Sequence, residues 1–145
     1  MRTLYADASA LVRAYLGDEL GSANLRSLLL ETEEQVITSE LSLLEVTRAF
    51  RAAERSGRIL DAAAALVGVE EDFSGRGPVL VIGLRSDPVL QRAREVVLAH
   101  RVGTLDAIHL AVAIEESEAL GEPIVFVTRD GEQSIAARAL GLEVA

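Results

Sequence analysis

Short apolar runs alternate along the chain with longer segments in which apolar residues recur every three or four positions. Each short run predicts a strand, and the five predicted strands are Arg2–Ala6, Gln35–Thr38, Val79–Ile82, Ile124–Val127 and Leu142–Val144. Most of these runs are continuously apolar rather than alternating with polar residues. That pattern is typical of parallel strands buried on both faces.

The periodic segments between the strands predict helices. The predicted helices are Ala8–Leu16, Leu20–Glu31, Ser39–Ser56, Arg58–Phe73, Asp87–His100, Thr104–Leu120 and Glu132–Leu140. We expect Thr38 or Ser39 to begin the third helix and Gly57 to end it. Strands interleaved with helices predict an α/β fold, a three-layer α/β/α sandwich with a five-stranded parallel sheet. We expect one domain that spans residues 1–145.

Composition narrows the function classes. The chain has 145 residues, of which 50% are hydrophobic, and its net charge of −9 argues against unaided binding to nucleic acid. It contains no cysteine and no lysine, which excludes zinc-thiolate sites and phosphate-binding loops that end in Gly-Lys. No apolar run approaches the ~18 residues of a membrane span, and no leader is evident. We therefore expect a cytoplasmic protein with no membrane segment.

Two acids follow predicted strands. Asp7 comes directly after the first strand, and Asp130 follows "IVFVT" near the end of the chain. In open parallel sheets, ligands bind beyond the carboxyl ends of the strands, so both positions are candidate site positions. Each acid also has a structural interpretation, because Asp7 could cap the helix from Ala8 and Asp130 the helix near Glu132.

A third acid, Asp106, lies in the first turn of a predicted helix, in "GTLDAIHLAVA". Thr104 is a natural N-cap there, and the helix dipole favours an acid in the first turn. Asp106 nevertheless shares a helix face with His109, Leu110 and Ala113, which is largely apolar. An acid on such a face needs a partner or a metal.

Glu45, in "SELSLLEVTRAF", is the fourth candidate acid, and an ion pair with Arg48 on a solvated face is its structural alternative. His109 is either a metal ligand or, more often for such a residue, a buried histidine satisfied by its neighbours. Ser9 and Thr128 each lie two residues from a strand-end acid. Their hydroxyls could support a metal-bound water or make local turns.

Four segments together resemble one family. "YADASALV", "SELSLLEVTRAF", "TLDAIHLAVA" and "VFVTRDGEQSIAARALGLEV" follow one another in the order and spacing of the PIN-domain nucleases, and among them of the VapC-like toxins of bacterial toxin–antitoxin pairs. The resemblance covers essentially the whole chain, and the family fold agrees with the sandwich predicted above. No motif of the family is recognised between Leu60 and Arg101.

The resemblance implies both a site and an activity. It makes Asp7, Glu45, Asp106 and Asp130 the catalytic, metal-binding acids, with Ser9 and Thr128 as the neighbouring hydroxyls. Four converging carboxylates need a counter-charge, and an oxygen-only site favours Mg²⁺, with Mn²⁺ as a possible substitute. The implied reaction is endonucleolytic cleavage of RNA, and the implied partner is a small antitoxin whose C-terminal segment covers the pocket.

Two further features bear on partners. Arg48, Arg51 and Arg55 recur at helical spacing after Glu45 and are either an RNA-binding stripe or a solvated face. The leucine-rich faces of "LVRAYL" and "LRSLLL", together with the resemblance, predict a homodimer, although ordinary core packing would explain those leucines equally well.

Two other classes of protein share part of this pattern. Haloacid-dehalogenase phosphatases and response-regulator receivers also place acids at strand ends, but both normally use a lysine, which this chain lacks. A PIN-like module that has lost catalysis and only binds a partner is the alternative that stays open.

Overall fold

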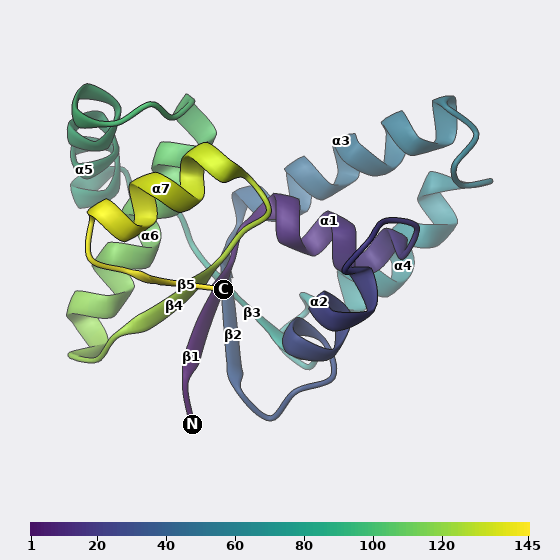
Figure 1. The fold of residues 1–145 in the computed structure, drawn as a ribbon. Coiled ribbons are helices and arrows are strands. Elements are labelled where there is room, and N and C mark those ends of the chain that lie inside the picture. Colours follow the sequence, from purple (N-terminus) through teal and green to yellow (C-terminus); the bar gives the residue numbers. More distant parts are fainter.

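The centre of the molecule is a five-stranded sheet, described by a computed structural model of residues 1–145 (Figure 1). The strands are β1 (Thr3–Ala6), β2 (Gln35–Ser39), β3 (Val79–Ile82), β4 (Ile124–Val127) and β5 (Glu143–Val144). Their order is β3-β2-β1-β4-β5, and every neighbouring pair is parallel. The predicted strands and the predicted parallel sheet are therefore confirmed.

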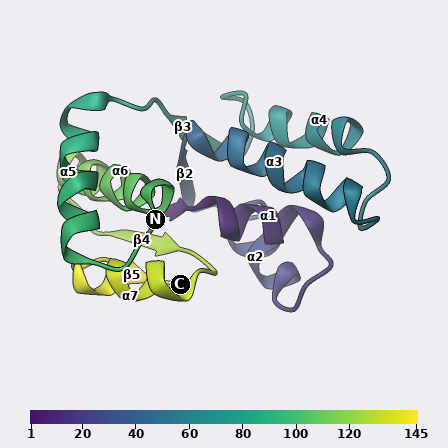
Figure 2. The ribbon, with the colours of Figure 1, turned by 90° about the horizontal axis from the view of Figure 1, so that it is seen from above.

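Seven helices cover the two faces of the sheet (Figure 2). One layer contains α1 (Ala8–Leu16), α2 (Ser22–Leu29), α3 (Leu41–Arg55) and α4 (Ala62–Asp72). The other layer contains α5 (Ser86–Ala99), α6 (Thr104–Leu120) and α7 (Gly131–Ala139). The predicted α/β/α sandwich is thus confirmed. None of the helices is long and apolar enough to cross a membrane.

Two hydrophobic clusters, one on each face, hold the layers to the sheet. Successive strand residues point to opposite faces, so Leu4 packs with the α1–α4 layer and Tyr5 with the α5–α7 layer. The leucine-rich faces of α1 and α2 belong to the first cluster, where Leu11, Leu25 and Leu29 are fully buried. Those leucines therefore stabilise the fold within one chain and give no support to the predicted homodimer.

The first residues of the helices differ from the sequence predictions more than the bounds of the strands do. Thr38 stays in β2, because its hydroxyl donates to the Ala6 carbonyl (2.6 Å), and α3 begins after Glu40 without a side-chain cap. α4 begins at Ala62, where the Asp61 side chain caps it, rather than at Arg58. α6 has Gly103 at its N-cap, so the expected capping by Thr104 is wrong.

The topology places Asp7 and Asp130 just beyond the carboxyl ends of two neighbouring strands near the middle of the sheet. β1 is the central strand and pairs with β4 along its whole length, so Asp7 after β1 lies beside Thr128 after β4. Because all strands are parallel, their carboxyl ends meet at one edge of the sheet. The helices α3 and α6 also begin there (Figure 1).

Candidate active site

Asp7 is the most deeply buried of the candidate acids, with 2% of its surface exposed. Its Oδ1 accepts a hydrogen bond from the Ala10 N–H (2.9 Å), so it does cap α1. The hydroxyl of Thr128 lies 2.7 Å from Oδ2, and that of Ser9 lies 2.8 and 2.9 Å from the two oxygens. Burial raises the pKa of Asp7, and these hydrogen bonds oppose the rise.

Asp130 and Asp106 differ in how their carboxylates are satisfied. Asp130 caps α7, because its Oδ1 accepts from the Gln133 N–H (2.9 Å), and it makes no other side-chain hydrogen bond. Asp106 lies half-buried in the first turn of α6, and its carboxylate has no hydrogen-bond or ion-pair partner. Capping and a site role are therefore compatible for Asp7 and Asp130, since each cap occupies one carboxylate oxygen.

Glu45 contacts His109 rather than Arg48, so the ion pair with Arg48, which was its structural alternative, does not form. The His109 Nε2 lies 2.5 Å from Glu45 Oε1, and its Nδ1 lies 2.7 Å from the Tyr5 hydroxyl. Burial raises the pKa of Tyr5 well above its usual value, so the phenol keeps its proton and donates to Nδ1. The neutral tautomer that satisfies both contacts carries its hydrogen on Nε2 and donates it to Glu45.

His109 is therefore a buried, fully satisfied residue. It is 1% exposed, and both of its ring nitrogens are occupied by protein groups. A ring with no free nitrogen does not bind a metal. Its position orients the Glu45 carboxylate at the edge of the candidate site instead.

The four acids influence one another electrostatically. The pKa of Asp106 is raised from 3.8 to about 6, first by burial and then by the negative charges of Asp130, Asp7 and Glu45. A half-buried, unpaired carboxyl whose pKa is raised by the charges of three other acids is a position at which a cation would lower the electrostatic energy.

The candidate acids supply only oxygen donors, and they are not arranged as an enclosed metal site. No group of three or more acidic or histidine side chains is arranged to hold a metal ion. Mg²⁺ usually keeps several waters and takes only one or two carboxylates directly. The oxygen-only donor set and the unpaired Asp106 therefore agree with Mg²⁺, and the same donors would accept Mn²⁺.

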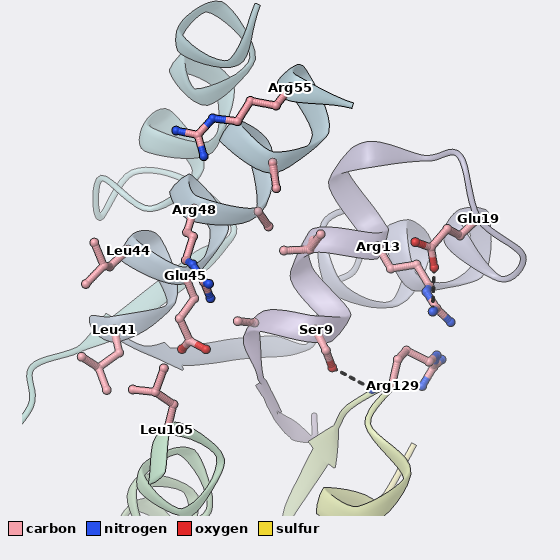
Figure 3. A pocket seen from close by; sticks show the side chains of 14 residues that line it. Ser9, Arg13, Glu19, Leu41, Leu44, Glu45, Arg48, Arg55, Leu105 and Arg129 are labelled. Carbon is pink, nitrogen blue, oxygen red and sulfur yellow. Dashed lines mark hydrogen bonds and ion pairs between the residues drawn. The ribbon is translucent and has the colours of Figure 1, made fainter. Parts of the chain in front are cut away.

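A groove of about 880 Å³ runs from this region between α1 and α3 (Figure 3). Ser9 and Glu45 line the end near the acids, and Leu105 of α6 and Arg129 line the same end. The apolar residues Ala8 and Val12 of α1 and Ala49 and Ala52 of α3 also line the groove. Of the four candidate acids only Glu45 lines the groove, and Asp7, Asp106 and Asp130 lie outside its lining.

Arginines without carboxylate partners line the groove. Arg48 and Arg55 are among its lining residues and form no ion pair (Figure 3). The guanidinium of Arg129 donates only to the Thr128 and Ala145 carbonyls (2.8 and 3.2 Å). Arg51, in contrast, does not line the groove and pairs with Glu54 (3.3 Å). The groove is therefore locally basic in an acidic protein.

Three residues near the site were missed by the sequence analysis. Tyr5 fixes the His109 tautomer, the backbone N–H of Arg129 donates to Ser9 Oγ (2.9 Å), and the Gln133 side chain contacts Thr128 (2.9 Å). The spacing of Gln133 from Asp130 is that of a capping box, which was the one available signal. Nothing in the sequence indicated where its side chain points.

The chain matches the model of one known protein family. A model of the PIN domain matches residues 4–139, so the chain belongs to the PIN-domain family. The resemblance found in the sequence is thereby confirmed. A comparison with curated proteins found no match.

Solved structures share the fold at low sequence identity. VapC20 of Mycobacterium tuberculosis, a toxin that cleaves the sarcin-ricin loop, is 18% identical with a TM-score of 0.64, and the match covers 96% of this chain and 95% of that one. FitAcB of Neisseria gonorrhoeae is 18% identical (TM-score 0.61, coverage 97% and 95%). VapBC2 of Rickettsia felis, solved with a DNA fragment from its promoter, is 14% identical (TM-score 0.66, coverage 99% and 97%).

Proposed function

We propose that the protein is a metal-dependent endoribonuclease that acts as the toxin of a toxin–antitoxin pair. The observation that carries the proposal is the set of four acids at the carboxyl edge of the sheet, three of which raise the pKa of Asp106 through their charges. A bound divalent cation would offset this repulsion between the carboxylates. The family and the cleaving activity of the VapC20 toxin add support.

Asp7, Glu45, Asp106 and Asp130 are the residues that would hold Mg²⁺. Asp106 has no competing partner, which suits it for direct ligation, whereas Asp7 is already held by Ser9, Thr128 and the Ala10 N–H. A bound cation of this kind supplies an activated water and stabilises charge on the phosphate oxygens. The protein itself contributes rigid placement, because Asp7 follows the central strand β1, which pairs with β2 and β4, and Glu45 is fixed by His109.

The groove between α1 and α3 is the proposed path of the RNA. Arg48, Arg55 and Arg129 are free to contact phosphate oxygens, and the planar guanidinium suits bidentate contact with phosphate. These positive charges lie along the groove that ends at the acids. They offer a local explanation of how a protein with a net charge of −9 binds a polyanion.

The same groove is the proposed docking place for the C-terminal segment of an antitoxin, as the resemblance implies. The VapBC2 structure with promoter DNA supports a further role of such a pair in binding its own promoter. We also propose a homodimer and a cytoplasmic location, both from the family resemblance.

RNA cleavage by purified protein tests the proposal. We expect Mg²⁺-dependent cleavage, abolished by a chelator, with a panel of tRNAs and a sarcin-ricin loop RNA as substrates. Asp7→Asn should lower the rate at least about 100-fold, because a carboxylate that holds the ion is lost. Glu70→Gln removes one charge from an exposed position on α4 and is the matched control.

The alternative is a PIN-like module that binds partners without catalysis. It is favoured by one observation, that no three acids are arranged to enclose a metal ion. It predicts that highly purified protein leaves every RNA intact at all Mg²⁺ and Mn²⁺ concentrations. Under that outcome the nuclease proposal fails.

A further inference from the structure

A single buried side chain connects the segments that carry two of the four acids and, through Thr128, a third. Gln133 of α7 has no exposed surface. Its Oε1 lies 2.9 Å from the Thr128 hydroxyl, and its Nε2 donates to the backbone carbonyl of Asp106 (3.3 Å). Its own N–H donates to Asp130. Gln133 therefore touches the end of β4, the start of α6 and the first turn of α7.

Thr128 extends this connection to Asp7. Its hydroxyl lies 2.7 Å from Asp7 Oδ2 and also accepts from the Asp130 N–H (3.0 Å). From Asp106, the chain of contacts runs through Gln133 and Thr128 to Asp7. Each contact is between buried or half-buried groups, where a hydrogen bond is held more strongly than at the surface.

The Thr128 hydroxyl has one hydrogen and three neighbouring oxygens that can accept it. These are Asp7 Oδ2, Gln133 Oε1 and, at 3.3 Å, the Ser9 hydroxyl. Gln133 and Asp7 are therefore joined through a single hydroxyl that both side chains contact.

We infer that Gln133 is a positioning residue of the candidate metal site. It links the segments that carry Asp106 and Asp130 to Thr128 and, through the Thr128 hydroxyl, to Asp7, and so sets the separation of these three acids. This inference rests on the proposed function for its chemistry. It does not make Gln133 a ligand or a contact to RNA, because its side chain has no exposed surface.

Gln133→Met tests the inference with little change to the fold. Methionine has nearly the same length and no polar atom. Thr128 still has Asp7 as an acceptor, and the Asp106 carbonyl keeps its helical partner, so no buried group loses its only hydrogen bond. We therefore expect a melting temperature close to that of the wild type.

The measurements are Mn²⁺ affinity, followed by the electron paramagnetic resonance of free Mn²⁺, and the kinetics of RNA cleavage. We expect Gln133→Met to weaken Mn²⁺ binding and to lower kcat, each about 10–100-fold, the range found when groups that orient metal ligands are removed. KM for RNA should stay unchanged, because Gln133 is out of reach of RNA. Tyr15→Phe, which removes one hydrogen bond to Asp72 distant from the acids, is the control.

Thr128→Val cuts the same connection at its other end. It should weaken Mn²⁺ binding to a similar degree, and Gln133→Met added to it should have little further effect, because the connection is already broken. This variant decides the question even where Gln133→Met fails to fold. Additive effects of the two substitutions would contradict the inference.

The outcomes separate this inference from the proposed function. Wild-type Mn²⁺ affinity in Gln133→Met or in Thr128→Val overturns the inference, while RNA cleavage by the wild type leaves the proposed function intact. Wild-type protein that binds Mn²⁺ but cleaves no RNA overturns the proposed function, and the affinities still decide the role of Gln133. Wild-type protein that binds no Mn²⁺ overturns both.

Discussion

Asp106→Asn should stabilise the metal-free protein while abolishing its activity. The pKa of Asp106 is about 6 in the folded protein against an ordinary value of 3.8, so ionisation of this carboxyl opposes folding. One pKa unit corresponds to about 1.4 kcal/mol, which gives about 3 kcal/mol in total. Solvent screening of a half-buried carboxyl reduces this to about 1.5–2 kcal/mol.

The helix dipole subtracts a smaller amount. Asp106 lies in the first turn of α6, where a negative charge is favourable by about 0.5 kcal/mol, and asparagine loses this. The net gain is therefore about 1–1.5 kcal/mol above neutral pH. For a chain of this size, it corresponds to an increase in melting temperature of about 2–5 °C.

The gain should depend on pH with a definite sign. The folded-state pKa is raised, so protonation of Asp106 favours the folded state, and that contribution is full below pH 3.8 and lost as the pH rises through about 6. The advantage of Asp106→Asn is thus largest at pH 7.5 and shrinks towards pH 4.5. The raised pKa of Asp7 acts in the same direction in both proteins.

Thermal unfolding of the wild type and of Asp106→Asn, in the presence of a chelator at pH 7.5 and at pH 4.5, measures this gain in stability. Glu70→Gln is the charge-matched control. Mg²⁺ at a hundred times its Kd should stabilise the wild type by about 2.7 kcal/mol and should not stabilise the variant to that extent. An Asp106→Asn melting temperature equal to that of the wild type at pH 7.5 would refute the reasoning. So would a gain that Glu70→Gln reproduces, or one that does not change with pH.

Three other predictions concern the groove, the His109 network and assembly. Arg48→Glu with Arg55→Glu should weaken RNA binding and flatten its dependence on salt concentration, whereas Arg51→Glu should change neither; filter binding across a salt series checks this. Tyr5→Phe leaves the His109 Nδ1 without its donor, so unfolding experiments should show a loss of about 1–3 kcal/mol, and ¹⁵N spectra of the wild type should show the Nε2–H tautomer. Light scattering of concentrated protein should give the mass of a dimer, and a monomer at every concentration would contradict that prediction.

The sequence predicted the strands well because burial on both faces leaves a simple signal. β1 and β4 are continuous apolar runs, and their parallel pairing follows from the helices between them. Helix starts were predicted less well, because they depend on contacts made in the fold. Thr38 has the chemistry of a cap, but its hydroxyl is engaged by the Ala6 carbonyl of the neighbouring strand.

The residues of the candidate site were likewise predicted only in part. Asp7 and Asp130 were identified from topology alone, since acids at the ends of parallel strands lie at one edge of a sheet. The partner of Glu45 was not predictable, because it comes from α6, 64 residues further along the chain. Gln133 lay in a helical pattern that gave no sign of its burial. Its importance depends on where three separate elements meet.

The candidate site is assembled from distant parts of the chain, and this bears on how an active molecule arises during synthesis. Thr128 contacts Asp7 across 121 residues, and β4 is inserted beside β1 after most of the chain has been made. Contacts of such long sequence separation form late and slowly in folding. A nascent chain that has folded only its first helical layer therefore lacks Asp106 and Asp130. The proposed nuclease activity therefore needs the complete fold, because two of the four candidate acids belong to the last part of the chain to be made.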